Sequence, residues 1–308
     1  MEEAMEVYEK VDELPQGQAD LRYLQHGCMV LEGGAWRGLY TQGVLDALME
    51  NDINLDCTIG VSAGAMSGLA YVSGQIGFSG RMNLTYRNDQ NYCGIGALKK
   101  DHGITGFTYA FTELFDKGGF ARQDFLNSPR RFVAVATDID TGKPVFFEKG
   151  KCPDIFKAVQ ASATVPYVSE PVEIEGRKHL DGGLGVKVPY EWALKEGYEK
   201  IVVIRTRDRD YRKPVKKPSG INHMYRKEPK AMEDLAEEAP RYNISLDRLD
   251  MLEKKKRLYV IAPSKPITIR RFEDDMNKLG DLYWQGYEDG KNEIRGLKAY
   301  LGISTQEE

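Results

Sequence analysis

The sequence is poor in the residues from which metal sites and disulfide frameworks are built. Its four cysteines (Cys28, Cys57, Cys93 and Cys152) lie far apart, no C-x-x-C pair occurs, and only four histidines are present. This distribution favours neither a zinc site nor a disulfide scaffold, and it is typical of a protein in a reducing cytoplasm. We therefore expect no metal centre and no structural disulfide.

Signals for secretion or for membrane insertion are also missing. The first residues, MEEAMEVYEKVDEL, are acidic and contain neither a basic region nor an apolar run, so we expect no secretory signal. The stretch 57–80 has no charged residue and is long enough to span a bilayer, but it contains six glycines and four serines. It is better explained as a buried strand–helix unit. We expect a cytoplasmic protein, with peripheral contact to a membrane as an additional possibility.

The chain has no large excess of charge of either sign. Its net charge of −4 and pI near 5.8 give no attraction for nucleic acid, so we expect no such partner. An apolar content of 41% and a charged content of 29% are ordinary for a globular protein. A chain of 308 residues can form one large α/β domain, or a domain with an appendage, and composition sets no oligomeric state.

Apolar patterns predict strands that alternate with helices. Short buried runs favour strands, and apolar spacings of three and four favour helices after them. The predicted strands are 26–31, 55–61, 132–137 with a hairpin partner at 144–148, 200–205 and 258–262; the predicted helices are 36–49, 63–72, 154–163, 192–197 and 231–257. This alternation predicts an α/β fold with a mostly parallel sheet covered on both faces. The sequence gives no assignment for 79–119.

The organisation that we predict has three parts. Residues 1–25 form a polar lead-in, residues 26–205 the α/β core, and residues 206–308 a charged excursion followed by a C-terminal extension of helices and a strand packed on the core. Between Arg205 and Lys230 ten basic residues face three acidic ones, with proline and glycine among them. That composition is typical of an exposed segment. A solvated face is the ordinary interpretation, and contact with anionic lipid headgroups is the alternative.

The motif G-V-S-A-G at 60–64 places Ser62 between a predicted strand and a predicted helix. A serine on such a turn is lifted above the sheet at a helix N-terminus, which favours developing negative charge. Gly60 and Gly64 are small because side chains at these positions would collide across the turn. The pattern predicts a nucleophile, and the alternative is a tight turn in which Ser62 only caps the helix.

A second glycine-rich loop, E-G-G-A-W-R-G at 32–38, also joins a strand to a helix. Its successive N–H groups would form a cradle for an anion. Neither G-x-G-x-x-G nor a following G-K-[ST] is present, so a nucleotide site is disfavoured. The other use for such a cradle is an oxyanion hole, to which Arg37 would add positive charge. A purely structural turn is the alternative.

An activated serine needs a base, and no histidine has an evident catalytic context. Asp181 ends a strand-like stretch and is followed by Gly182 and Gly183, which leave room for a close neighbour. A carboxylate in a water-poor pocket can act directly as the general base. The alternative is that D-G-G is only a turn.

Taken in order, E-G-G-A-W-R-G, G-V-S-A-G and D-G-G resemble the motifs of the patatin-like phospholipase family, and in particular of its bacterial members. The resemblance runs from about Met29 to Arg205 and includes A-T-D-I-D-T-G-K-P-V-F-F and A-S-A-T-V-P. It implies a three-layer α/β/α sandwich and a Ser–Asp dyad without histidine. The implied activity is hydrolysis of a lipid ester through an acyl-enzyme, with no metal or organic cofactor.

The resemblance assigns a role to each matching position. Ser62 corresponds to the nucleophile and Asp181 to the base. The oxyanion loop corresponds to Gly33, Gly34, Ala35 and Arg37, the elbow glycines to Gly60 and Gly64, and the supporting turns to Gly38, Gly182 and Gly183. Ala35 departs from the family pattern, which usually has a third glycine there. An alanine still offers its N–H but adds a methyl group beside the acyl pocket.

Two other functions compete with this interpretation. A conventional α/β-hydrolase would use a Ser–His–Asp triad, with Asp181 and His223 as the partners of Ser62 and with His179 as a second histidine to test. A non-catalytic protein would use the glycine cradle to bind an anion or a lipid. Reactivity toward a fluorophosphonate separates the enzymes from the binding protein.

Overall fold

The computed structural model describes residues 5–215 and 229–303, and its centre is an eight-stranded sheet in the order β10-β9-β2-β3-β5-β8-β7, with β6 paired to β5. Five strands, from β10 to β5, are parallel to one another, whereas β6, β7 and β8 pair antiparallel. The strands are β2 (Gln25–Leu31), β3 (Leu55–Val61), β5 (Arg131–Asp138), β6 (Pro144–Glu148), β7 (Val172–Ile174), β8 (Arg177–Asp181), β9 (Ile201–Ile204) and β10 (Tyr259–Ile261). The predicted mostly parallel sheet is confirmed.

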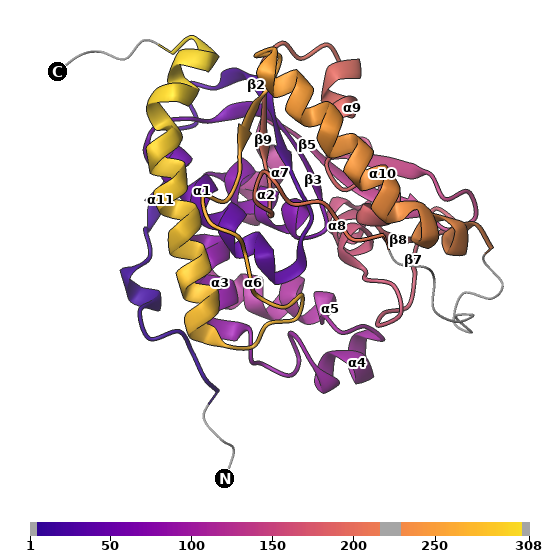
Figure 1. The fold of residues 1–308 in the computed structure, drawn as a ribbon. Helices are drawn as coiled ribbons and strands as arrows, with labels where there is room; N and C mark the ends of the chain where they lie inside the picture. Colours follow the sequence, from indigo (N-terminus) through magenta and orange to yellow (C-terminus); the bar gives the residue numbers. More distant parts are fainter. Residues whose placement is uncertain (1–4, 216–228, 304–308) are drawn as a thin grey trace.

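Helices cover both faces of this sheet (Figure 1). On one face lie α1 (Gly38–Glu50), α2 (Ala63–Ser73), α8 (Ile155–Ala163) and α11 (Met276–Leu301). The other face is covered by α9 (Tyr190–Lys195) and α10 (Pro229–Lys254). Strand side chains alternate between the two layers, because Met29 and Leu31 pack toward α1 while Cys28 and Val30 pack toward α9 and α10. The fold is therefore a three-layer α/β/α sandwich.

The unassigned stretch 79–119 is mostly helical. It contains α3 (Phe78–Tyr86), α4 (Ile95–Asp101), α5 (Phe107–Tyr109), the π-helical turn η3 (Ala110–Leu114) and α6 (Phe115–Gly118), and α7 (Arg122–Asn127) follows. Phenylalanine side chains from these short helices pack edge-to-face against one another and against α8. The stretch had no single apolar period because its helices are short and bury aromatic side chains from several turns.

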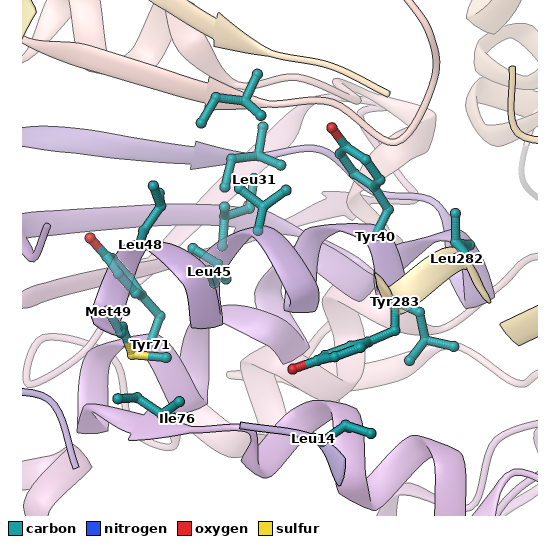
Figure 2. Packing of buried hydrophobic residues seen from close by; sticks show 14 of the residues in the cluster. Leu14, Leu31, Tyr40, Leu45, Leu48, Met49, Tyr71, Ile76, Leu282 and Tyr283 are labelled. Carbon is teal, nitrogen blue, oxygen red and sulfur yellow. The ribbon is translucent and has the colours of Figure 1, made fainter. Parts of the chain in front are cut away.

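The long C-terminal helix α11 packs tightly on α1. The two helices approach so closely that a side chain at Gly286 would lie 2.0 Å from the carbonyl oxygen of Tyr40, and one at Gly43 would lie 2.1 Å from that of Tyr283. Figure 2 shows Tyr40, Leu282 and Tyr283 in the core that these helices share with β2. The C-terminal segment is thus part of the core on this face of the sheet.

Two sequence-based expectations need correction. The lead-in 1–25 contributes to the core through Tyr8 and Leu14, and it contains η1 (Val11–Glu13) and β1 (Gly17–Gln18), which pairs with β4 (Gln75–Ile76). The basic stretch that begins at Arg205 is not exposed at its start, because Arg205 and Thr206 are fully buried; residues 216–228 lie outside the described part of the chain.

Two cysteines meet through the sheet pairing. Cys28 and Cys57 occupy facing positions on β2 and β3, and their sulfur atoms are 3.7 Å apart. Both remain free thiols and both are fully buried. Their distance in sequence concealed the contact because neighbouring parallel strands are separated by a crossover helix.

Candidate active site

Ser62 occupies a sharp turn between β3 and α2. Its backbone has φ +55° and ψ −124°, in a region that a residue with a side chain rarely adopts. A side chain at Gly60 would lie 2.6 Å from the amide nitrogen of Ala65, and one at Gly64 would lie 2.4 Å from the carbonyl oxygen of Leu31. Both elbow glycines are therefore required by close backbone approach, for the steric reason that the motif predicted.

The strained turn is held by a residue from a different helix. The backbone N–H of Ser62 donates to the hydroxyl of Ser162, at 2.8 Å, and that hydroxyl donates to the carbonyl oxygen of Val135, at 2.6 Å. Ser162 belongs to α8 and is fully buried. The Ser162 hydroxyl thus connects the elbow to β5. The sequence alone did not predict the contact of Ser162 with the elbow, because a serine in A-S-A is typical of any buried helix with small residues.

Asp181 is the last residue of β8, and hydrogen bonds of its backbone hold it in place. Its N–H donates to the carbonyl oxygen of Thr164, at 2.9 Å, and its carbonyl oxygen accepts from the hydroxyl of Thr137, at 3.0 Å. One carboxylate oxygen accepts from the N–H of Gly183, at 2.7 Å. A side chain at Gly182 would lie 2.0 Å from the carbonyl oxygen of Val135, so this turn must also be small.

The Asp181 carboxylate and the Ser62 hydroxyl line the same cavity, which has a volume of about 600 Å³ with its opening included. Burial raises the pKa of Asp181 above its ordinary value, while hydrogen bonding from the Ser62 hydroxyl and from the Gly183 amide lowers it in part. The positive charges of Arg271 and Lys187 also lower it. A carboxylate with a raised pKa beside a serine hydroxyl is chemically suited to accept a proton.

The glycine-rich loop forms one wall of this cavity. Gly33, Gly34 and Ala35 all line it, and Gly33 donates its N–H to the carbonyl oxygen of Lys187 at 3.4 Å. In the described part of the chain, the amides of Gly34 and Ala35 donate to no protein acceptor. Ala35 has φ +48°, so the alanine adopts a left-handed conformation that a glycine would reach more easily. The loop therefore presents two free N–H groups beside Ser62.

Arg37 follows in the turn η2 (Ala35–Arg37), and it is 8% exposed. Burial, together with the neighbouring charges of Arg207 and Arg271, lowers its pKa to about 10, although Glu32 acts in the opposite direction. Arg37 therefore remains a cation at neutral pH. Gly38 brings the start of α1 against α2, since a side chain there would lie 2.8 Å from the Cβ of Ala63.

An apolar cavity opens on the other side of Ser62. Its volume is about 580 Å³ with the opening included, and its lining includes Trp36, Leu39, Met66, Phe107 and Phe272. A smaller hollow of about 350 Å³ shares Met66 with it and continues toward Phe78 and Phe115. Ser62 therefore lines both a cavity with charged side chains and an apolar one.

The described histidines line neither of the two cavities at Ser62. His179 lies on β8 with 2% of its surface exposed, and its ring packs edge-on against Phe147. Among the described residues that line the Ser62 cavity there is no histidine. His223 belongs to the residues outside the described part of the chain.

Comparison with known proteins identifies the family. Residues 29–194 match the sequence profile of patatin-like phospholipases, which is more than half of the 308-residue chain. The chain belongs to the patatin-like phospholipase family. Residues 228–302 match a second profile, described only as a domain of unknown function, DUF6363.

Several named proteins share this patatin-like region. The uncharacterized protein YjjU of Escherichia coli is 28% identical over 202 residues, covering 60% of this chain and 54% of that protein. The lysophospholipase nte1 of Aspergillus terreus is 29% identical over 170 residues, covering 50% of this chain and 10% of that protein. The chain thus spans about half of the first relative's length. The crystal structure of VipD from Legionella pneumophila has 13% identity and a TM-score of 0.44, covering 96% of this chain and 72% of that one.

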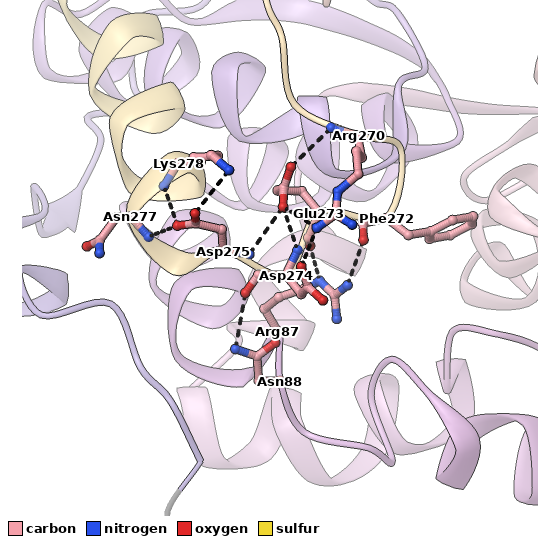
Figure 3. Close-up of polar contacts among 9 residues, drawn as sticks. All are labelled: Arg87, Asn88, Arg270, Phe272, Glu273, Asp274, Asp275, Asn277 and Lys278. Atoms are coloured by element: carbon pink, nitrogen blue, oxygen red, sulfur yellow. Dashed lines mark hydrogen bonds and ion pairs between the residues drawn. The ribbon is translucent and has the colours of Figure 1, made fainter.

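The C-terminal segment supplies residues that the family motifs did not include. Glu238 of α10 and Arg271, from the loop between β10 and α11, line the Ser62 cavity, and Phe272 lines the apolar cavity. The loop is anchored to the end of α3, where Arg87 donates to the carbonyl oxygen of Phe272 at 3.2 Å (Figure 3). Glu273 binds Arg270 at 2.8 Å in the same network. No sequence signal marks these residues, because only the tertiary fold brings the loop to the site.

Proposed function

We propose that this chain is a serine carboxylic-ester hydrolase that acts on a lipid, with Ser62 as the nucleophile and Asp181 as the general base. The observation that supports this most directly is the convergence of three features on one cavity. These are a serine on a strained elbow, a carboxylate whose pKa burial raises, and a loop with two free amides. A turn that served only to cap a helix would need neither the buried carboxylate nor the loop with free amides.

The reaction that we propose begins with attack of the Ser62 hydroxyl oxygen on the ester carbonyl carbon. Asp181 takes the proton, and the carbonyl electron pair moves to the oxygen, which the amides of Gly34 and Ala35 stabilise. When the tetrahedral intermediate collapses, the leaving alkoxide takes the proton from Asp181, and an acyl-enzyme remains. Asp181 then removes a proton from water, and the resulting hydroxide attacks the acyl carbon. When this second intermediate collapses, the Ser62 oxygen takes the proton back from Asp181 and the carboxylic acid is released.

The apolar cavity supports a lipid acyl group as the part of the substrate retained on Ser62. Its lining by Trp36, Met66, Phe107 and Phe272 would bury methylene groups, each contributing about 0.8 kcal/mol. In the described part of the chain no helix combines the length and hydropathy required to cross a bilayer.

A fluorophosphonate probe followed by mass spectrometry tests the proposal. We expect covalent labelling at Ser62, loss of labelling in Ser62→Ala, and loss of p-nitrophenyl acyl ester hydrolysis in both Ser62→Ala and Asp181→Asn. Ser67→Ala is the matched control, because Ser67 is another buried serine of α2 that lines neither cavity. Full hydrolysis by purified Ser62→Ala would refute the proposal.

The competing triad predicts a different pattern. If histidine were the base, His223→Ala or His179→Ala would abolish hydrolysis, whereas a Ser–Asp dyad tolerates both substitutions. The position of His179 away from the cavity favours the dyad.

A further inference from the structure

A second polar hollow adjoins the Ser62 cavity and is lined by basic side chains. Its volume is about 740 Å³ with the opening included, and it shares Gly33, Arg37, Lys187 and Arg271 with the Ser62 cavity. We call it the basic pocket. Its basic residues are Arg37, Lys187, Arg207, Lys213, Arg270 and Arg271.

The charges of the basic pocket are only partly balanced. Lys187 and Lys213 share a single carboxylate, that of Glu238, with Lys187 at 2.6 Å from it. Burial alone would raise the pKa of Glu238, but the two lysines outweigh burial and lower it, so this group is an anion. One negative charge therefore serves two positive ones.

Glu32 is the acidic residue in the described lining of the basic pocket, and its carboxylate is already hydrogen-bonded to other residues. Glu32 accepts hydrogen bonds from the hydroxyl of Tyr242 and from the N–H of Thr206, the latter at 2.6 Å. It is 1% exposed, which leaves it little freedom to reorient toward the arginines. These hydrogen bonds hold the Glu32 carboxylate in the wall of the pocket.

Three arginines of the basic pocket have no carboxylate partner among the described side chains. Among the residues whose side chains are described, no acidic group forms an ion pair with Arg37, Arg207 or Arg271. The Nε atom of Arg37 is buried and has no hydrogen-bond partner within that same part of the chain. These three guanidinium groups line one hollow, so their positive charges lie close together without a carboxylate between them.

The pocket is built from fixed parts of the fold. Arg37 lies in η2, Lys187 follows η4 (Gly182–Leu184), and Arg207 lies just beyond β9, where it donates to the carbonyl oxygen of Ile267 at 2.9 Å. Arg271 is carried by the loop that Arg87 anchors to α3 (Figure 3). The positive charge of Arg207, which belongs to the basic stretch 205–230, therefore faces a cavity and not an open surface.

We propose that the basic pocket binds the phosphate of a glycerophospholipid whose ester lies at Ser62, and that the preferred substrates have a headgroup of net negative charge, such as a phosphomonoester. This inference rests on the proposed ester hydrolase function. Arginine guanidinium groups match phosphate oxygens bidentately, and a phosphomonoester brings nearly two negative charges to an uncompensated cluster. A choline or ethanolamine headgroup would bring its cation into the same cluster and lose that advantage. The acyl chain would then lie on the opposite side of Ser62, in the apolar cavity.

The test compares two monomeric lysolipids with the same acyl chain, lysophosphatidate and lysophosphatidylcholine, by kcat/KM. We expect the wild-type protein to prefer lysophosphatidate, and Arg207→Gln to reduce this preference about tenfold, the loss of one charge-assisted contact. Arg207→Lys, which keeps the charge, should retain most of it. Arg295→Gln is the matched control, since Arg295 is exposed on α11 and lies outside every cavity of the site.

A binding measurement separates the possible sources of the phosphate. Calorimetric titration of Ser62→Ala with lysophosphatidate and with glycerol 3-phosphate should give tighter binding of the lipid, and Arg207→Gln should weaken both. Equal affinity for the two compounds would identify a free phosphate ester as the ligand and overturn the substrate assignment. An unchanged preference in Arg207→Gln would overturn the inference while ester hydrolysis stands. Absence of hydrolysis of every ester, with lysophosphatidate still bound, would instead refute the proposed function.

Discussion

Removal of the Ser162 hydroxyl is the sharpest test of how the elbow is held. Ser162 accepts the N–H of Ser62 and is itself fully buried, so in Ser162→Ala this N–H loses its acceptor in a site that water cannot easily reach. A buried donor without a partner costs about 1–3 kcal/mol. The unusual φ of Ser62 adds a tendency for the turn to relax once its anchor is gone.

The expected effects can be measured separately on stability and on catalysis. With unfolding entropy of about 2.1 cal/mol/K per residue, a loss of about 2 kcal/mol lowers the Tm of a chain of this length by about 3 °C. Displacement of a nucleophile by a fraction of an ångström to 1 Å lowers kcat by about tenfold to a hundredfold. KM should change little, because Ser162 lines neither cavity. Thermal melting and hydrolysis of a p-nitrophenyl ester provide the two readouts.

Ser67→Ala is the control for this substitution. Ser67 is also a buried serine, but its hydroxyl donates to the carbonyl oxygen of Ala63 within α2, at 2.8 Å, and accepts only from the side-chain amide of Gln42, at 3.3 Å, so its loss leaves no backbone amide unpaired. We expect a smaller change in Tm and a kcat close to that of the wild type. If Ser162→Ala matched Ser67→Ala in both measurements, the reasoning about the elbow would be wrong.

Three further predictions concern pH and packing. Because the pKa of Asp181 is raised and a general base must be ionised, the acid limb of kcat/KM should lie above the ordinary range of an aspartate, and Arg271→Gln should shift it to still higher pH. Burial raises the pKa of Asp46 to about 7, so the protonated Asp46 carboxyl stabilises the fold at low pH, and this contribution is lost as the pH rises to about 7. Asp46→Asn should raise the Tm at about pH 8 and flatten the dependence of the Tm on pH. Gly286→Ala should lower the free energy of unfolding by about 1–3 kcal/mol in a urea titration, because the new methyl group would meet the backbone of α1.

The parts of the fold that sequence could predict are those with a local signature. Strands β2, β3 and β5 are short buried runs, and helices α1 and α2 follow them with the expected apolar spacing, so their bounds agree with the predicted ranges to within a few residues. The elbow was predictable for the same reason, since the need for Gly60 and Gly64 is a steric property of one turn.

The remaining parts of the site depend on contacts between distant segments. Arg271 and Phe272 lie more than two hundred residues beyond Ser62 and reach it only because α11 packs on α1 and Arg87 anchors their loop. Charge composition was also misleading, because a run of basic residues ordinarily indicates a solvated face. Here Arg205 is fully buried and Arg207 faces a cavity, since the segment leaves the sheet at the end of β9 and crosses the site.

The groups that we propose for catalysis and those that we propose for headgroup preference lie largely in different segments of the chain. The patatin-like region 29–194 contains Ser62, Asp181 and the oxyanion loop, so it includes every group that our proposed chemistry requires. Four of the six basic residues of the basic pocket, from Arg207 onward, lie beyond that region, and Phe272, which lines the apolar cavity, also lies in the C-terminal segment. Exchange of the C-terminal segment between relatives should therefore alter headgroup preference more than the rate on a neutral ester. The anchoring of the 270–275 loop by Arg87 makes that segment a part of the site whose position is set by the core.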